Sequence, residues 1–372
     1  MRSAITRALG ALFLGAVPLE AQVPLPIFRL GAPIVQVGSS SGPIDGLLAG
    51  VIGATRLANG LIAIGDGSTP RIILFTAEGK IHLSLGRDGD GPGELRMPRW
   101  LGRCEPDGFA AYDAAQSRLT LFSGVGEVRR TIPVPPVAGF NHLVACLPAS
   151  QFFLLSRSGV STITPGTKGI VGTALARIRG TLVDTISTSI GGQEYYVDKA
   201  RRGFAEVPLG QKVLATSGPT RIYLCTNQNG RCTVFDTAGT QRGRFVVDLK
   251  RESVSTGDWE RARHRMIEAE PRVQSHKPMA LVLEDLAKPA DFPLIDQIQA
   301  DVEDRLWVRT FTGYGSDLAT WLILRQGGRP MAKALLPSEL KVLEIGRDYV
   351  LGVLRDVDGG ESVGLYRFKL PS

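Results

Sequence analysis

The stretch that decides the fold reads Asp66-Gly-Ser-Thr-Pro-Arg71-Ile-Ile-Leu-Phe75-Thr-Ala-Glu-Gly79. The marker consists of an Asp, a four-residue spacer, an Arg followed by four mostly apolar residues that end in Phe, a three-residue spacer and a Gly, and it returns along the chain. The first return keeps every spacing and comes 47 residues later. Recurrence of one pattern is the sign of a repeat architecture. The further copies are Asp113 to Gly126, Thr226 to Gly239 with Thr in the Asp position, and a more degraded one from Thr320 to Gly328.

Each marker lies in a unit of short antiparallel strands. An apolar run such as 60–64 precedes the marked strand, and another strand, 81–85, follows the turn at Gly79. Glycine supplies the positive φ that a tight hairpin turn needs. Asp and Arg at facing strand ends predict structural ion pairs across the hairpin, Asp66–Arg71 and Asp113–Arg118.

The spacing of the markers predicts six units. An unmarked unit spans Gln151 to Ile190, and a last unit follows in 340–370. Small sheets cannot bury both faces alone, and radial closure protects their edges. We therefore expect an all-β fold, a six-bladed β-propeller of four-stranded antiparallel blades, with a β-sandwich or open β-array as the alternative. The segment Ile27–Val37 is expected to add the outermost strand of the last blade.

Composition agrees with one large β-domain. The chain has 372 residues, 43% of them hydrophobic and 21% charged, which excludes a disordered chain. Its 44 Gly and 23 Pro indicate many turns. The net charge is +7, but no run of five Lys or Arg occurs, so we expect no nucleic-acid partner.

Residues 1–22 predict a secretory signal peptide, with Arg2 and Arg7 before the apolar stretch 8–17 and cleavage near Ala21. Loss of two arginines and one glutamate with this leader lowers the net charge from +7 to +6. An uncleaved N-terminal anchor is the alternative. No later stretch has 18 apolar residues, so the mature chain 23–372 is expected to lack a transmembrane span. We expect a periplasmic or secreted monomer.

Export permits disulfides, and the chain has four cysteines. Cys225 and Cys232 flank an Asn-Gln-Asn-Gly turn, which would place them opposite each other in a hairpin if the register is right. Cys104 and Cys146 lie at matching points of adjacent units, which makes a bridge between two blades conceivable. Four buried free thiols are the alternative.

A helical insertion is expected over about 252–290, between blades 4 and 5. Ser255 is a candidate N-cap, the run to Glu270 permits a helix, and Pro271 ends it. This helix is interpreted as a packing decoration, with a lid or partner surface as the alternative.

Motifs for catalysis are missing from the sequence. The four histidines form no zinc-binding spacing, and no Gly-x-Ser-x-Gly element occurs. The segment Asp88-Gly-Asp90-Gly-Pro-Gly-Glu94 offers three carboxylates to a hard cation but lacks the calcium-loop spacing. We expect no cofactor, with Ca²⁺ or another divalent ion as the alternative.

The segment Gly86-Arg-Asp-Gly-Asp-Gly-Pro-Gly-Glu-Leu95 resembles the inter-blade connection of NHL-type propellers. The strand Asp301-Val-Glu-Asp-Arg-Leu-Trp-Val308 is similar to the D-x-x-G-x-L-W-V strand of exported bacterial six-bladed propellers of the TolB-like and NHL-like group, with Asp304-Arg305 in place of the glycine step. The closing stretch 345–368 resembles that group's last blade. This resemblance implies a fold more than an activity, because the superfold has many unrelated functions.

Polar residues expected on the inner strands are candidates for a ligand site at one end of the axis. The resemblance leaves two functions open. We expect a non-catalytic propeller that binds a protein, peptide or glycan partner at one face. The alternative is a lactonase-like metal enzyme or a quinoprotein-dehydrogenase-like enzyme, which would require at least two of Asn141, Asp296 and Glu344 to converge. The candidates are Arg99, Trp100, Asn141, His142, Asp296, Gln297, Gln299, Glu344 and Arg347.

Overall fold

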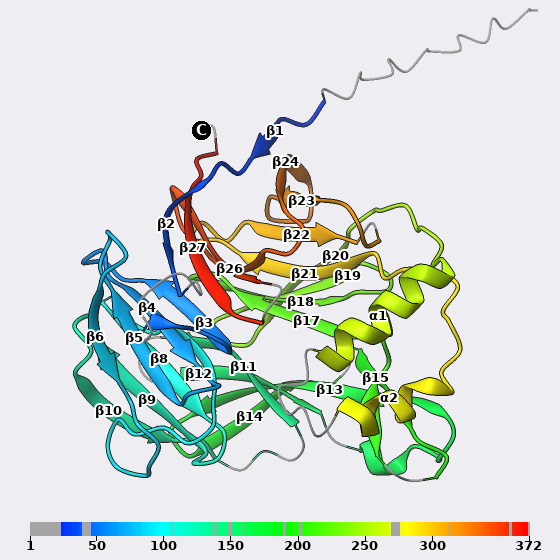
Figure 1. Cartoon of the computed structure of the whole chain (residues 1–372), viewed down its shortest axis with the longest axis horizontal. Coiled ribbons are helices and arrows are strands. Elements are labelled where there is room, and N and C mark those ends of the chain that lie inside the picture. Colours follow the sequence, from blue (N-terminus) through cyan, green and yellow to red (C-terminus); the bar gives the residue numbers. More distant parts are fainter. Residues whose placement is uncertain are drawn as a thin grey trace, which may run out of the picture.

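The computed structural model is a ring of six β-sheets around one axis (Figure 1). It describes residues 24–38, 46–105, 107–135, 137, 140–147, 151–157, 159–188, 191–200, 203–268, 276–311, 313–356 and 359–370. The predicted six-bladed β-propeller is confirmed, and we number the blades 1 to 6 along the chain. Blade 1 comprises β3 (Val51–Arg56), β4 (Ile62–Asp66), β5 (Arg71–Phe75) and β6 (Ile81–Leu85); blade 2 comprises β7 (Pro98–Arg103), β8 (Gly108–Asp113), β9 (Arg118–Ser123) and β10 (Val128–Pro133); blade 4 comprises β17 (Val213–Ser217), β18 (Arg221–Thr226), β19 (Arg231–Asp236) and β20 (Gln241–Val246).

Blade 3 is larger than the predicted unit 151–190. The second half of its long third strand, β13, pairs with β12, and the first half, 168–172, pairs with β15 instead. The strands β13, β15 and β16 therefore form a raised sheet beyond the end of the blade. The blade comprises β11 (Phe140–Leu147), β12 (Gln151–Arg157), the 3₁₀-helix η3 (Val160–Thr162), β13 (Lys168–Arg179), β14 (Leu182–Ser187), β15 (Gly192–Val197) and β16 (Phe204–Glu206).

The N-terminal segment joins two blades rather than one. Its second part, β2, pairs antiparallel with β27 at the edge of blade 6, as predicted. Its first part, β1, pairs parallel with β24 of blade 5, which the sequence analysis did not foresee. Blade 5 comprises β21 (Ile295–Ala300), β22 (Leu306–Thr310), β23 (Leu318–Leu324), β24 (Pro330–Pro337) and β1 (Ile27–Arg29); blade 6 comprises β25 (Lys341–Ile345), β26 (Tyr349–Arg355), β27 (Glu361–Arg367) and β2 (Pro33–Val37).

Apolar side chains fill the interfaces between neighbouring blades. Each of the six interfaces has its own buried cluster, formed by the facing sides of two sheets. Trp307 and Trp321 are fully buried between blades 5 and 6, as predicted for core residues. This packing explains the repeat, because every blade must present an apolar side to each neighbour.

The marker phenylalanines occupy equivalent places. Phe75, Phe122 and Phe235 each lie at or next to the last residue of the third strand of a blade and are 2% exposed. Each packs into the cluster shared with the preceding blade. The sequence repeat is thus a repeat of interface positions.

The insertion contains two helices where one was predicted, α1 (Thr256–Glu268) and α2 (His276–Glu284). Ser255 caps α1, because its Oγ accepts a hydrogen bond from the backbone N–H of Asp258 at 3.1 Å. The second helix was not predicted, because the expected helix ended at Pro271 and no further helix was expected after it. The described helices include none long and apolar enough to cross a bilayer.

Candidate functional site

One face of the ring carries both the helical insertion and the raised sheet of blade 3. The inner strands β3, β7, β11, β17, β21 and β25 all begin at this face, and the insertion enters β21 there. We call it the insertion face, and the other the opposite face. In Figure 1, α1 and α2 lie beside the raised sheet of blade 3.

The insertion and the raised sheet share a separate hydrophobic core. Trp259 of α1 and Leu283 of α2 are buried against Tyr196 of β15 and Ala205 of β16. Phe292 and the partly buried Tyr314 extend this cluster toward blade 5. The insertion is therefore fixed on the ring by its own packing.

Helix α1 reaches toward blade 6. The Arg265 guanidinium lies 4.7 Å from the ring centre of Tyr314 and forms a 2.8 Å ion pair with Glu339, in the connection between blades 5 and 6. Burial raises the pKa of Tyr314, so the hydroxyl stays protonated at neutral pH. The helix thus bridges the raised sheet and the ring.

A groove of about 730 Å³ runs between the two helices. Charged side chains alternate along α1, and several form ion pairs within the helix, such as Arg263–Glu260 at 2.5 Å and His264–Glu268 at 3.2 Å. Leu281 of α2 adds an apolar side chain that is 37% exposed. The groove therefore offers both charged and apolar contacts to a partner.

Three basic side chains gather near the axis at the insertion face. They are His142 on β11, Arg157 at the end of β12 and Lys341 at the start of β25. Solvent reaches His142, but the protein atoms around it exclude much of the bulk water. This desolvation, together with the charges of Arg157 and Lys341, lowers the pKa of His142 to about 4. We call these three residues the axial basic cluster.

Asp296 is the second residue of β21, toward the same face of the ring, but is neutralised. Its carboxylate accepts two hydrogen bonds from Arg309, at 2.6 Å from Nε and 2.5 Å from Nη2. Such a bidentate pair leaves little net charge. Gln297, the next residue, donates from Nε2 to the Val342 carbonyl oxygen of blade 6 at 2.6 Å.

Glu344 lies at the other end of the inner strands. Its carboxylate accepts hydrogen bonds from the Tyr349 and Thr55 hydroxyls and, at 3.2 Å, from the backbone N–H of Arg56. Arg103 of blade 2 lies 3.4 Å away. Burial and the neighbouring carboxylate raise the pKa of Tyr349. This cluster joins blades 6, 1 and 2 and leaves no free carboxylate to a ligand.

The remaining predicted candidates are dispersed. Arg99 is exposed on β7, and Trp100 packs partly buried against the cluster between blades 2 and 3. Gln299 is partly buried on β21, and Arg347 is exposed in the turn after β25. Asn141 belongs to β11, but its side chain lies outside the described residues.

Carboxylates do not gather into a metal-binding set in the described part of the chain, where no three of His, Cys, Asp and Glu come together. Asp296 and Glu344 lie at opposite ends of the inner strands, each beside an arginine. The convergence that the enzyme alternative requires of this pair is therefore not found.

Arginines also bind the carboxylate-rich loop 86–97. Glu94 pairs with Arg87 and Asp90 with Arg96, at 2.5 and 2.6 Å. Arg118 donates to the carbonyl oxygens of Asp90, Gly91 and Glu94 at 2.7 to 2.9 Å. These bonds fix the conformation of the loop.

The two predicted hairpin ion pairs differ. Arg71 lies 3.6 Å from Asp66, so that pair is confirmed. Asp113 instead accepts hydrogen bonds from the backbone N–H groups of residues 96, 97, 115 and 116. The prediction for Asp113–Arg118 was wrong because Arg118 turns to the carbonyl oxygens of loop 86–97.

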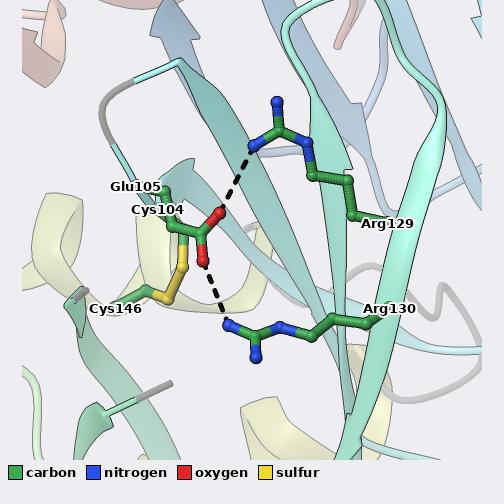
Figure 2. The surroundings of a disulfide bond; sticks show 5 residues. All are labelled: Cys104, Glu105, Arg129, Arg130 and Cys146. Atoms are coloured by element: carbon green, nitrogen blue, oxygen red, sulfur yellow. Dashed lines mark hydrogen bonds and ion pairs between the residues drawn. A yellow bond between two sulfur atoms is a disulfide. The ribbon is translucent and has the colours of Figure 1, made fainter. Parts of the chain in front are cut away.

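Disulfides join all four cysteines. Cys225 and Cys232 face each other across β18 and β19, and Cys104 of blade 2 is bonded to Cys146 of blade 3. Figure 2 shows the second bond beside Glu105, which pairs with Arg129 at 3.4 Å and Arg130 at 3.0 Å. Glu105 has a φ of 73°, so these two arginines hold a residue in a left-handed conformation.

Sequence reasoning missed Arg157 because it lies on the second strand β12, whereas the candidates were polar residues of inner strands. It missed Lys341 although this residue begins the inner strand β25. Arg157 directly follows the buried run Phe152–Ser156, and a charged residue at the end of such a run marks where a strand emerges. Which strand ends share one face of the ring depends on tertiary structure.

Comparison with known proteins supports the fold. No family profile matches this chain, and no curated protein resembles it significantly in sequence. A member of the DUF4221 family from Bacteroides vulgatus is similar in structure, with a TM-score of 0.50 and 12% identity over 87% of this chain and 94% of that one. A protein from Bacteroides fragilis that is named as an exported protein has a TM-score of 0.47 and 12% identity over 93% and 99%. Regucalcin from Agrobacterium tumefaciens, a calcium-binding protein, has 0.42 and 10% over 93% and 97%. The likeness to the DUF4221 family member shows a shared fold.

Proposed function

We propose that this chain is an exported, non-catalytic propeller that binds a protein, peptide or glycan partner of the cell envelope through its insertion face. The observation that supports this proposal is the second core, which fixes two helices and the raised sheet on that face alone. The ring does not need this core, because its six interfaces are already filled.

The groove between α1 and α2 is the proposed contact surface. An interface combines an apolar centre with a charged rim, and this groove has Leu281 beside the charged side chains of α1. Ordering the insertion costs conformational entropy, which its own core offsets. A partner then meets a surface that is already ordered, which favours affinity.

We further propose that the chain belongs to the TolB-like and NHL-like group, that it is exported by its leader, and that its binding function needs no cofactor. The leader, residues 1–22, lies outside the described residues. N-terminal sequencing of the chain recovered from the periplasm or medium is expected to begin near Ala21 or Gln22.

The test is capture from an envelope extract by the immobilised chain, with the bound material identified by mass spectrometry and, for glycans, on an array. Leu281→Arg places a charge in the groove and is expected to reduce capture about tenfold. Leu182→Arg is the matched control, because Leu182 is 61% exposed on the outer strand β14. Equal capture by both variants, or no specific capture by the unaltered chain, would overturn the proposal.

A further inference from the structure

We infer that the axial basic cluster at the insertion face is an anion site, where His142, Arg157 and Lys341 together hold a carboxylate or phosphate group of a ligand. This inference deepens the proposed function by naming the chemistry of what binds. It rests on that function only for the ligand's origin in the cell envelope.

The cluster is built from opposite sides of the ring. His142 and Lys341 lie on the inner strands of blades 3 and 6, and Arg157 lies on β12 beside the first residue of β11. Arg157 also reaches blade 4, where its Nη2 lies 3.5 Å from the Val213 carbonyl oxygen. Three blades therefore fix the positions of these groups.

The positive charge of the cluster is not compensated within the described residues. Neither Arg157 nor Lys341 has a carboxylate within ion-pair distance there, whereas Arg309 on the second strand β22 pairs with Asp296 at 2.5 Å. The hydrogen bond of Arg157 to Val213 is long, and its Nε is buried without a partner. A guanidinium has five N–H donors, and the donors left for a ligand are those of its two Nη atoms.

The electrostatic effect on His142 agrees with this placement. The charges that act on it are those of Arg157 from β12 and Lys341 from β25, and both oppose its protonation. The Arg157 charge also acts on Tyr195 of the raised sheet, where the charge of Glu206 acts in the opposite direction. Arg157 and Lys341 disfavour a positive charge on His142. For the same reason they favour an anion bound between them.

An anion in this place reverses the effect on His142. A carboxylate or phosphate near Arg157 and Lys341 cancels their repulsion and accepts a hydrogen bond from the protonated imidazole. The pKa of His142 is then expected to rise from about 4 toward its ordinary value of 6.5. By linkage, anion binding strengthens as the pH falls from 6.5 toward 4.

The experiment follows the His142 imidazole by NMR in the purified chain with both disulfides formed. The chain has four histidines, and His142→Gln assigns the signal. The pH titration is run in sodium chloride, and then with inorganic phosphate or with succinate at the same ionic strength. We expect at least one of the two anions to raise the pKa of His142 and to bind about tenfold more weakly to Arg157→Gln and to Lys341→Gln.

The two anions separate the sources of the ligand group. An effect of phosphate alone indicates a phosphate-bearing ligand, and an effect of succinate alone indicates a carboxylate. The control Lys80→Gln removes an exposed lysine from the turn between β5 and β6 and is expected to change nothing. No effect of either anion, or an effect that the double variant Arg157→Gln/Lys341→Gln retains, would overturn the inference. The capture experiment does not enter this result, so the two proposals can fail separately.

Discussion

His142 is a single residue whose protonation couples pH to the stability of the ring. Its pKa is about 4 in the folded chain, while the unfolded chain has the ordinary value of 6.5. The unfolded state therefore binds more protons between these values, so stability is complete above pH 6.5 and falls as the pH decreases to 4. Because solvent reaches the side chain, we expect a loss of about 1 to 2 kcal/mol.

Replacement of His142 by Gln is expected to remove this part of the pH dependence. The measurement is denaturant unfolding at pH 7, 5.5 and 4.5 for both proteins. His82→Gln serves as the control, since His82 is exposed on the outer strand β6. The prediction is contradicted if the free energy of unfolding of His142→Gln falls with decreasing pH as steeply as that of the unaltered chain.

Glu344 is the second residue with a clear energetic role. Glu344→Ala removes the acceptor for two hydroxyls and leaves Arg103 without its carboxylate. We expect a loss of about 2 to 3 kcal/mol in the free energy of unfolding, because buried polar partners are left unsatisfied. The measurement is equilibrium unfolding in guanidinium chloride.

Glu339→Ala is the comparison, because it removes an exposed ion pair to Arg265 worth less than about 1 kcal/mol. If both variants lose the same small amount of unfolding free energy, Glu344 does not stabilise the contact between the blades.

At the level of elements, the two disulfides differ in what they constrain. Cys104–Cys146 joins two blades across a separation of 42 residues, whereas Cys225–Cys232 closes a hairpin with a separation of 7. Loop entropy predicts a loss of about 4 kcal/mol for the double alanine variant of the first pair and about 2.5 kcal/mol for the second. Chemical denaturation of the two variants checks the order, and a larger loss for the hairpin pair would contradict it.

Elements were predicted well where turn chemistry or capping is local. Ser255 marks the start of α1, and the glycine turns mark the ends of the repeated strands. Asp304 shows the limit, because it adopts a φ of 58° where the resemblance expects glycine, and its carboxylate accepts hydrogen bonds from Thr220 of blade 4. The role of Asp304 is a contact with another blade, which the sequence of its own segment does not reveal.

At the level of the whole molecule, the N-terminal segment closes the ring. Strand β2 completes blade 6, and β1 adds to blade 5, so residues 26–37 hold two blades together. Removal of residues 24–30 takes away β1 only and is expected to lower the unfolding temperature by a few degrees. Removal of residues 24–37 also takes away β2 and the buried Val37, and we expect a loss about twice as large or greater.

Calorimetry of the two truncated chains distinguishes these effects. If both truncated chains unfold at the same temperature as the full chain, the ring closes without this segment.

The sequence by itself determined the repeat, the number of blades and the burial of Phe75, Phe122 and Phe235, because each blade must present the same apolar positions to its neighbours. It also identified His142 as a polar residue on an inner strand. Only the tertiary structure decided that Arg157 and Lys341 lie near it, while Asp296 and Glu344 lie apart. The physical reason is that local spacing fixes which residues a strand carries, whereas the closure of the ring fixes which strand ends meet.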